Sequence, residues 1–297
     1  MAISEYQSTV VMPKADKPFP CILDFLTCRF PGIDRDTWKA RMMSGKVLTQ
    51  EGEVVSRDTP YMPLKKLHYF REVEEETVVP FAEEIIFCNV ELLVACKPHF
   101  LPVTPAGRYV NQCLLHRLKE KTGNRDLAPI NRIDRETAGL VLFSMNPKTR
   151  GLYQKLFMDG QVKKTYEAVA KFPRDQEETS WRVENRLAKG EPWFRMKTVP
   201  GKTNAVSKIS LVRVKGKQAV FQLCPITGKK HQLRVHLSGL GFPILNDRYY
   251  PDLLPERPER INSFTDPLQL LAKRIQFRDP VSEKQVDYET RRKLLHT

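Results

Sequence analysis

Several features that mark membrane, secreted or cofactor-dependent proteins are missing from this sequence. It has no apolar run long enough to cross a bilayer, and its first 18 residues lack the apolar core of a signal peptide. It also has no glycine-rich phosphate loop, no dinucleotide-binding fingerprint and no His-Cys metal cluster. We therefore expect a cytoplasmic protein with no cofactor, no bound metal and no membrane partner.

Cysteines are few and irregularly spaced. There are six, and none belongs to a Cys-x-x-Cys pair. Three of them, Cys88, Cys96 and Cys113, lie in apolar stretches. This pattern is typical of small buried side chains in a reducing compartment and argues against a disulfide framework.

Acidic residues are in the minority. The 297 residues include 49 Lys and Arg but 35 Asp and Glu, which gives a formal net charge of +14. Such an excess favours polyanionic partners and speeds encounters with nucleic acid. The chain is long enough to bury a full core, either as one large domain or as two smaller ones.

The most informative stretch is INRIDRETAGLVLF, residues 130–143. Asp134 lies between Arg132 and Arg135, and an apolar run that predicts a buried strand follows. We expect an acid flanked by fixed positive charge to stay ionised at neutral pH, available as a nucleophile or base. By itself, however, the pattern is more typical of an ion-paired loop carboxylate.

Three further stretches occur in a fixed order around this one: ELLVACKPHFLPVTPAG (91–107), KKTYEAVA (163–170) and CPITGKKHQLRVHLSGLGFPILND (224–247). Together the four stretches resemble the RluA-type family of pseudouridine synthases, from about residue 80 to near residue 290. The resemblance implies an α+β fold with a mixed, largely antiparallel central sheet flanked by helices and loops. It also implies isomerisation of uridines in RNA by base flipping and an aspartate-dependent rearrangement of the glycosidic bond.

The same resemblance implies roles for four residues. Asp134 matches the catalytic aspartate, and Arg234 matches the arginine that pairs with it and keeps it ionised. Tyr166 matches the tyrosine that lies against the flipped uracil, and Arg132 matches the side chain that fills the space left by the flipped nucleotide. A planar guanidinium suits that last position because it stacks and pairs with phosphate at once.

Other basic residues in these stretches are candidates for contact with the RNA backbone. They are Arg135, Lys164, Lys229, Lys230 and His231. His231 and His236 are equally compatible with a place in the core. The sequence departs from the family at Asn131, where histidine is usual, and this affects contacts to the substrate and not the reaction.

The N-terminal part resembles a second RNA-binding fold. We predict a loose arm over residues 1–18, an alpha-L RNA-binding module over 19–79 and the catalytic domain over 80–297. Two short helices, the second capped by Asp34 or Asp36, precede a small sheet that turns at Glu51-Gly52. The phosphate-facing surface predicted for the module consists of Arg35, Lys39, Arg41 and Lys46, which could also form an ordinary solvated helix face.

Elements of the catalytic domain follow from caps and periodicity. We predict a helix that ends at Gly123, a helix that starts at Asn146-Pro147 with Leu152 inward, and a hairpin that turns at Lys215-Gly216. We assign no regular structure to residues 171–203, which are polar and charged.

Two other functions remain open. A metal-independent ribonuclease could use His231 or His236 with Asp134, and a non-catalytic RNA-binding or ribosome-assembly protein could share the scaffold. We expect a monomer that acts on ribosomal RNA in preference to transfer RNA.

Overall fold

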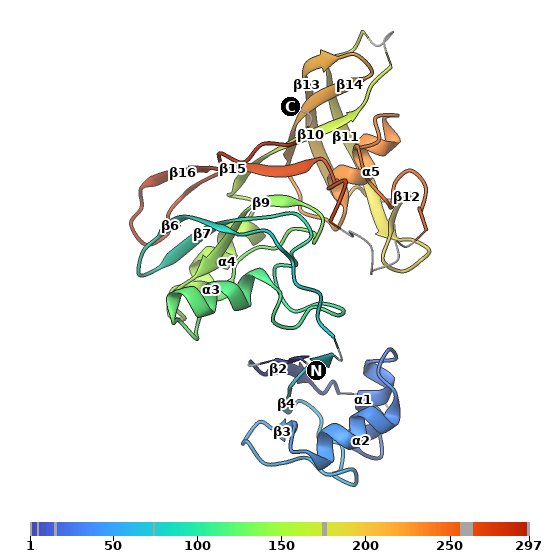
Figure 1. The fold of residues 1–297 in the computed structure, drawn as a ribbon, viewed down its shortest axis with the longest axis vertical. Coiled ribbons are helices and arrows are strands. Elements are labelled where there is room, and N and C mark those ends of the chain that lie inside the picture. Colours follow the sequence, from blue (N-terminus) through green and yellow to red (C-terminus); the bar gives the residue numbers. More distant parts are fainter. Residues whose placement is uncertain are drawn as a thin grey trace. The chain divides into compact units, whose positions relative to one another are not determined.

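The computed structural model describes residues 2–4, 6–14, 17–73, 75–173, 177–255 and 264–295. The chain divides into two compact units (Figure 1). The first runs to Thr77 and takes in Ala106–Asn111, and the second holds Val78–Pro105 and the chain from Gln112 onward. The boundary thus lies close to the predicted one at residue 80.

The segment Ala106–Asn111 joins the first unit although the sequence predicted it within the catalytic domain. The N–H groups of Val110 and Asn111 donate to Glu76 Oε1 at 2.5 and 2.8 Å. The Glu76 carboxylate therefore ties this loop to the end of the first unit.

The first unit contains two helices and a three-stranded antiparallel sheet in the order β2-β4-β3. The elements are α1 (Ile22–Arg29), α2 (Arg35–Met43), β2 (Ser8–Val11), β3 (Val47–Thr49) and β4 (Lys66–Tyr69), with β1 (Ala2–Ile3) paired to β5 (Glu72–Val73). Asp34 caps α2 by accepting the N–H of Thr37 at 2.7 Å, as one of the two predicted caps. Trp38 and Leu26 are fully buried between the helices and the sheet.

Part of the predicted loose arm is ordered. Residues 8–11 form β2, which pairs with β4, and Met12 is fully buried in the core of the unit. The apolar residues Val10 and Met12 alternate along an extended chain, so the arm supplies an edge strand. Residues 1, 5, 15 and 16 of the predicted arm lie outside the described residues. The predicted turn at Glu51-Gly52 is present with a short second arm: Leu48 pairs with Val54, and the N–H groups of Thr49 and Val55 donate to the carbonyl oxygens of Glu53 and Val47 at 2.8 and 2.9 Å.

The second unit is built on an 11-stranded sheet, whose main path is β12-β11-β13-β14-β10-β15-β9-β7-β6, with β16 beside β15 and β8 beside β9 (Figure 1). The strands are β6 (Glu84–Cys88), β7 (Leu92–Lys97), β8 (Ala128–Pro129), β9 (Ala138–Ser144), β10 (Lys163–Lys171), β11 (Ser180–Lys189), β12 (Met196–Val199), β13 (Ala205–Lys215), β14 (Gln218–Pro225), β15 (Leu270–Arg278) and β16 (Gln285–Glu289). Within the described chain β9 and β15 pair in parallel, and the other strand pairs of this sheet are antiparallel. The mixed, largely antiparallel sheet expected of an α+β fold is confirmed.

Three helices pack on this sheet: α3 (Leu114–Thr122), α4 (Arg150–Met158) and α5 (Gln232–Gly239). Gly123 ends α3 with φ of 66°, as predicted. In the described part of the chain, every helix is too short or too polar to traverse a lipid bilayer.

The start of α4 differs from the prediction. Asn146 accepts a hydrogen bond from the N–H of Lys148 at 3.0 Å, which forms a turn, and the helix begins only at Arg150. The buried face also differs from the prediction: Leu152 is 48% exposed, and Tyr153 is buried in its place.

Strands β11 and β12 occupy the region to which the sequence assigned no structure. Along β11 exposed and partly buried residues alternate, with Trp181 and Val183 on the inner face. The outer face is charged, so the strand carries few apolar residues and gives a weak signal in the sequence. Residues 174–176 of this region lie outside the described chain.

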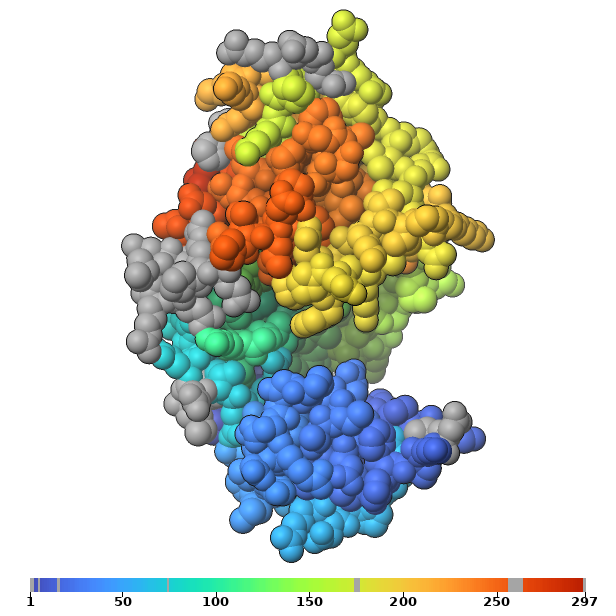
Figure 2. Space-filling model, turned by 90° about the vertical axis from the view of Figure 1, so that its right-hand side faces the viewer, coloured from blue at the N-terminus to red at the C-terminus, as the bar shows by residue number. Residues whose placement is uncertain are grey.

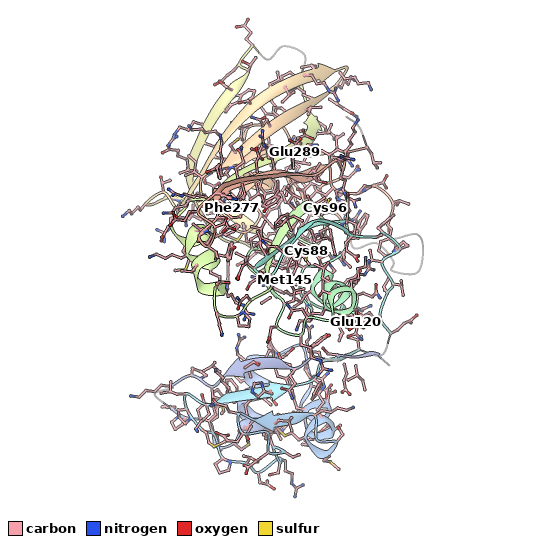
Figure 3. The ribbon with its side chains drawn as sticks, turned by 90° about the vertical axis from the view of Figure 1, so that its left-hand side faces the viewer. Cys88, Cys96, Glu120, Met145, Phe277 and Glu289 are labelled. Carbon is pink, nitrogen blue, oxygen red and sulfur yellow. The ribbon has the colours of Figure 1, made fainter. Side chains whose placement is uncertain are left out.

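Two of the three cysteines that lie in apolar stretches are buried. All six are free thiols; Cys96 on β7 and Cys113 are buried, as predicted, whereas Cys88 is exposed (Figure 3). Cys88 lies on β6, the last strand of the main path, where much of the surface faces solvent.

A glycine permits the parallel pairing at the centre of the sheet. Gly139 pairs with Ala272 across β9 and β15 and has a φ of 114°. A Cβ atom there would lie 2.2 Å from the Ala272 carbonyl oxygen. Only glycine therefore allows β9 to approach β15 so closely, directly after the loop that carries Asp134.

Candidate active site

The loop that carries Asp134 is fastened to β9 at its start and closed by a tight turn at its end. The Asn131 side chain accepts the N–H of Leu142 at 2.8 Å, and the N–H of Thr137 donates to the Asp134 carbonyl oxygen at 3.1 Å. Asn131 is where the sequence departs from the family pattern, and here its amide anchors the loop. The Asp134 carboxylate therefore projects from a fixed turn.

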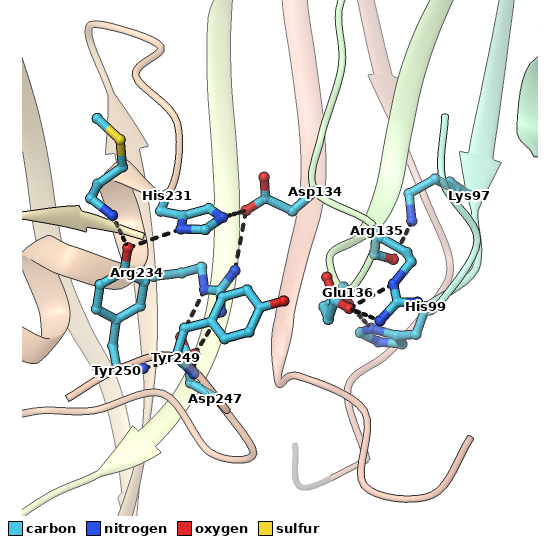
Figure 4. A network of polar contacts seen from close by, with 11 residues as sticks. Lys97, His99, Asp134, Arg135, Glu136, His231, Arg234, Asp247, Tyr249 and Tyr250 are labelled. Atoms are coloured by element: carbon cyan, nitrogen blue, oxygen red, sulfur yellow. Dashed lines mark hydrogen bonds and ion pairs between the residues drawn. The ribbon is translucent and has the colours of Figure 1, made fainter. Parts of the chain in front are cut away.

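Two residues, one at the last position of β7 and one just beyond its end, hold the other side of the loop (Figure 4). Lys97 is fully buried, and its ammonium donates to the carbonyl oxygens of Pro98 and Arg135, both at 2.9 Å. His99 Nδ1 donates to the Glu136 carbonyl oxygen at 2.6 Å. Burial lowers the pKa of Lys97 to about 7, against the charges of Glu136 and Asp134. The sequence suggested no role for either residue.

Arg234, on α5, is shared between two carboxylates (Figure 4). Its Nε and Nη2 donate to Asp247 at 2.8 and 2.6 Å, while its Nη1 lies 3.5 Å from Asp134 Oδ2. The predicted pairing with Asp134 is therefore present, but the closer, two-pronged pair is with Asp247. Burial alone would lower the pKa of Arg234, but the hydrogen bonds to Asp247 raise it, so the guanidinium stays charged.

Asp247 is the main residue that the sequence interpretation missed. Its side chain is only 1% exposed, and Oδ1 also accepts the N–H groups of Tyr249 and Tyr250 at 2.9 and 3.2 Å. It stands at the end of the stretch 224–247, within the resemblance. An aspartate in the same stretch as Arg234 could have been predicted as its partner, since a buried arginine needs a carboxylate.

Two tyrosine rings cover the Arg234 guanidinium. Its Cζ lies 4.9 Å from the ring centroid of Tyr249 and 5.3 Å from that of Tyr250. The Tyr250 hydroxyl accepts the N–H of Met196 at 2.7 Å and lies 2.9 Å from His231 Nδ1. These contacts fix the rings around the arginine.

His231 lies beside the candidate catalytic acid. Its Nε2 is 3.8 Å from Asp134 Oδ2, and burial, with Arg234 and Lys230, lowers the pKa of His231 to about 3. The ring is therefore neutral at neutral pH. If the Tyr250 hydroxyl donates to Nδ1, the ring proton sits on Nε2 and faces the carboxylate, whereas the other tautomer would turn a lone pair towards it.

The charge state of Asp134 has a different origin from the one predicted. Burial raises its pKa, and Arg234 opposes this, although 27% of the side chain is still exposed. The flanking arginines do not offset this: Arg132 is exposed to solvent, and Arg135 pairs at 2.8 Å with Glu136, whose charge raises the pKa of Asp134 further. The expectation that the flanking arginines hold its pKa down is wrong, because consecutive side chains on a turn diverge.

Tyr166 lies on β10, directly after an irregularity in its pairing with β15. The ring packs against the core cluster of the sheet and is only partly buried. Burial raises the pKa of Tyr166, and the charge of Asp134 raises it further. The hydroxyl therefore stays protonated, and the ring is near enough to feel the carboxylate.

The loop 227–231 is organised by a single amide. Gln232 Oε1 accepts the Thr227 hydroxyl at 2.6 Å and the N–H of Lys229 at 3.1 Å, while Nε2 donates to Ser207 Oγ at 2.8 Å. The ammonium of Lys164 lies 3.5 Å from the Thr227 carbonyl oxygen, against the same loop. Lys229 and Lys230 are left exposed beside the site.

His236, the second histidine considered, lies elsewhere. It is buried, and its Nε2 is 3.1 Å from Asn185 Oδ1. Burial lowers the pKa of His236 to about 4. It belongs to the core of α5, which was one of the two alternatives.

The predicted phosphate-facing surface of the first unit is largely neutralised. Arg41 is buried, lies 5.1 Å from the Trp38 ring centroid and pairs with Glu72 at 3.2 Å, and Lys46 pairs with the same carboxylate. The structure therefore removes Arg41 from that surface, because a buried arginine cannot meet phosphate. The other two predicted residues, Arg35 and Lys39, stay 47% and 43% exposed, in ion pairs with acids of the helices.

Metal-ligating side chains do not converge anywhere in the described residues: no group of three or more His, Cys, Asp or Glu is found there.

Comparison with known proteins gives a consistent result. A family model described as RNA pseudouridylate synthase matches residues 91–239. The protein "RNA pseudouridine synthase 7" of Oryza sativa subsp. japonica is 26% identical over 235 residues, 77% of this chain but 60% of its own length. The "tRNA pseudouridine synthase C" of Pasteurella multocida is 29% identical over 230 residues, 68% of this chain and 88% of its own length.

Among solved structures, "Human RNA Pseudouridylate Synthase Domain Containing 4" aligns with a TM-score of 0.54 and 26% identity. It covers 70% of this chain, and the match takes in 87% of that structure. The fold described above is thus the one found in that structure.

Proposed function

Because the chain belongs to the RNA pseudouridylate synthase family, we propose that it isomerises uridines to pseudouridines within RNA. The observation that carries the proposal is the setting of Asp134. One partly exposed carboxylate stands on a fastened loop, 3.5 Å from a buried, permanently charged arginine. Asp247 orients that arginine by pairing with the two guanidinium nitrogens that do not face Asp134.

The reaction breaks the bond between the uracil base and its ribose, turns the base and rejoins it through carbon. No atom is gained or lost overall. Breaking the glycosidic bond calls for a nucleophile or base at the junction of sugar and base, and an ionised carboxylate can serve as either. Arg234 supplies the compensating charge for that carboxylate. Neutral His231, with its Nε2 facing Asp134, adds a polar contact without adding charge.

The substrate base has to leave the stack to reach this carboxylate. Tyr166 offers a ring near Asp134 against which a flipped base can lie. Arg132 is exposed and forms no ion pair within the described residues, so its guanidinium is available to the RNA. These two roles rest on the match to the family motifs and on these positions.

A direct test uses RNA with tritium at C5 of uracil. The wild-type protein is expected to release tritium while the RNA chain stays intact. Asp134→Asn keeps the size of the side chain but removes the charge, and it should bind RNA and release no tritium above background. Substantial turnover by the folded variant would refute the role of Asp134.

The same assay separates the alternatives. Cleavage of the labelled RNA would support a ribonuclease. The structure favours a ribonuclease less. His236 contacts Asn185 and not Asp134, and His231, which is neutral near pH 7, has no proton to spare as a general acid. Binding with neither tritium release nor cleavage would support a non-catalytic RNA-binding protein.

The RNA substrate is the finer part of the proposal. The sequence interpretation favoured ribosomal RNA, whereas the relative from Pasteurella multocida carries the name of a tRNA pseudouridine synthase. We keep both classes as candidates, together with a cytoplasmic location, a monomeric state and no cofactor. Mapping pseudouridines in total RNA with and without the protein would identify the target.

A further inference from the structure

Trp193 is an exposed aromatic residue in the connection between β11 and β12. Its side chain is 76% exposed, whereas Trp38 is fully buried and Trp181 packs on the rings of Phe221 and Phe242. Figure 2 shows this part of the chain, in yellow, on the face turned to the viewer. The ring of Trp193 is therefore open to a ligand from solvent, and its neighbours indicate what it could bind.

The connection that carries Trp193 is a closed turn. The N–H of Arg195 donates to the Pro192 carbonyl oxygen at 2.9 Å, and the N–H of Gly190 donates to the Arg195 carbonyl oxygen at 3.0 Å. The Arg195 side chain donates to the Pro251 carbonyl oxygen at 2.6 Å, which fastens the turn to the segment after Asp247. The indole is therefore presented from a fixed position.

A row of aromatic contacts connects this indole to the candidate active site. The Trp193 ring meets Phe194 edge to face at 5.9 Å, and Phe194 lies 5.2 Å from Tyr249. Tyr249 in turn covers the Arg234 guanidinium. Trp193 is thus the solvent-facing end of the wall whose inner end surrounds Arg234.

A cation accompanies the indole. The Lys230 ammonium lies 5.6 Å from the Trp193 ring centroid. The charge of Lys230 also opposes the rise that burial causes in the pKa of Asp134, so this lysine is near enough to the carboxylate to act on it. A flat apolar ring beside an exposed positive charge complements a nucleotide, which presents a flat base and an anionic phosphate.

We propose that Trp193 and Lys230 form a subsite for an unpaired nucleobase that neighbours the target uridine in the substrate RNA. The base stacks on the Trp193 indole, and the phosphate of the same nucleotide pairs with the Lys230 ammonium. This inference rests on the proposed function for the identity of the RNA. Every base has a ring face, so the subsite would tolerate different bases and would raise affinity rather than read sequence.

The test measures binding and chemistry separately. Binding is measured on a background carrying Asp134→Asn, with an oligouridylate of about nine nucleotides and a base-free oligomer of the same backbone and length. Trp193→Phe keeps an aromatic face, and Trp193→Leu keeps apolar bulk without one. Met158→Leu, at a side chain that is 85% exposed on α4, is the matched control.

We expect oligouridylate to quench indole fluorescence, and Trp193→Leu to abolish the quench. We also expect Trp193→Leu to weaken binding about tenfold, the lower range for loss of one base–aromatic stack. Trp193→Phe and Met158→Leu should bind like the background protein. The base-free oligomer should bind all four proteins equally, because only phosphate contacts remain.

Equal affinity of Trp193→Leu and Trp193→Phe for oligouridylate would overturn the subsite. An equal quench by the base-free oligomer would overturn it too, since no base is there to stack. The two proposals fail differently. Absence of tritium release from every RNA refutes the isomerase and leaves the binding result standing, whereas tritium release with unaltered binding by Trp193→Leu refutes only the subsite.

Discussion

At the scale of single residues, the site depends on the unequal exposure of two carboxylates that share one arginine. Asp247 is 1% exposed and takes two nitrogens of the Arg234 guanidinium, whereas Asp134 is 27% exposed and meets the third from 3.5 Å. The buried acid therefore orients the arginine, and the exposed acid stays available to substrate. This division suits a catalytic carboxylate. Its charge has to be stabilised by an arginine, but its oxygens have to remain open to the substrate.

The two arginines near Asp134 should respond differently to substitution. Arg234→Lys replaces a planar fork with a point charge and should reduce turnover at least tenfold while RNA affinity changes little, because Arg234 is internal. Arg132→Ala should lower both affinity and turnover. Extruding a base costs a few kcal/mol in paired RNA and less in unpaired RNA.

Kinetics on a paired and on a bulged substrate distinguish the two roles. The Arg132→Ala defect should shrink on the bulged RNA, and the Arg234→Lys defect should persist. A parallel response of both variants would contradict the separate roles.

Lys97 should make stability depend on pH. Its pKa is about 7 when folded, against an ordinary value of 10.5, so between these values the unfolded chain binds the extra proton. The free energy of unfolding should therefore rise with pH in that window, by up to about 1.4 kcal/mol per pH unit. Below pH 7 both states are protonated and the cost of the buried charge is present in full.

Urea titrations of the wild type and Lys97→Met at pH 7, 8 and 9 test this. Other titrating groups cancel in the comparison, so the wild type should become more stable relative to the variant as pH rises. Parallel curves would mean that the ammonium is solvated in the folded protein.

At the scale of elements, the close approach of β9 and β15 decides where the Asp134 loop ends. The pairing of Gly139 with Ala272 brings two distant segments of the chain together in parallel. β9 is buried along its whole length, so the strand cannot slide to relieve a clash. The loop therefore takes its position from a rigid strand.

Gly139→Ala should destabilise the second unit by several kcal/mol, since its Cβ would clash with backbone and its φ of 114° disfavours alanine. Gly151→Ala is the matched control, because a Cβ there meets nothing within 4 Å on α4. That change should be neutral or stabilise by up to about 1 kcal/mol. Thermal melts of both variants measure the difference, and a wild-type melt for Gly139→Ala would contradict the packing argument.

At the scale of the whole molecule, each unit has its own core. The first buries Trp38, Phe25 and Leu67 among two helices and three strands, and the second buries β7 and β9 within its sheet. A unit with a separate core can fold alone. The first unit resembles an RNA-binding module in the sequence, although Glu72 neutralises part of its predicted basic surface.

A fragment that starts at Val78 should melt cooperatively and bind RNA more weakly than the whole chain. Its affinity should depend less on salt, with the slope reduced by about 0.7–0.9 for each phosphate that the first unit would otherwise neutralise. Binding isotherms over a range of salt concentrations measure this. Identical slopes for fragment and whole chain would show that the first unit does not touch RNA.

The sequence by itself determined the features that a few neighbouring residues encode. The Asp34 cap of α2, the Gly123 stop of α3 and the turn of the β13–β14 hairpin are local, and so is the continuous apolar run of β9. The order of the motifs also led to the family, because each motif is contiguous.

Only the tertiary structure decided what depends on distant partners. It pairs Asp247 with Arg234, hydrogen-bonds Lys97 to the backbone of the Asp134 loop and buries Arg41 in an ion pair with Glu72. It also reversed the expected sign of the pKa shift of Asp134, since burial outweighs charges that are adjacent only along the chain. Burial and charge pairing are properties of the packed chain, because they are set by groups tens of residues apart that meet only when the sheet closes around them.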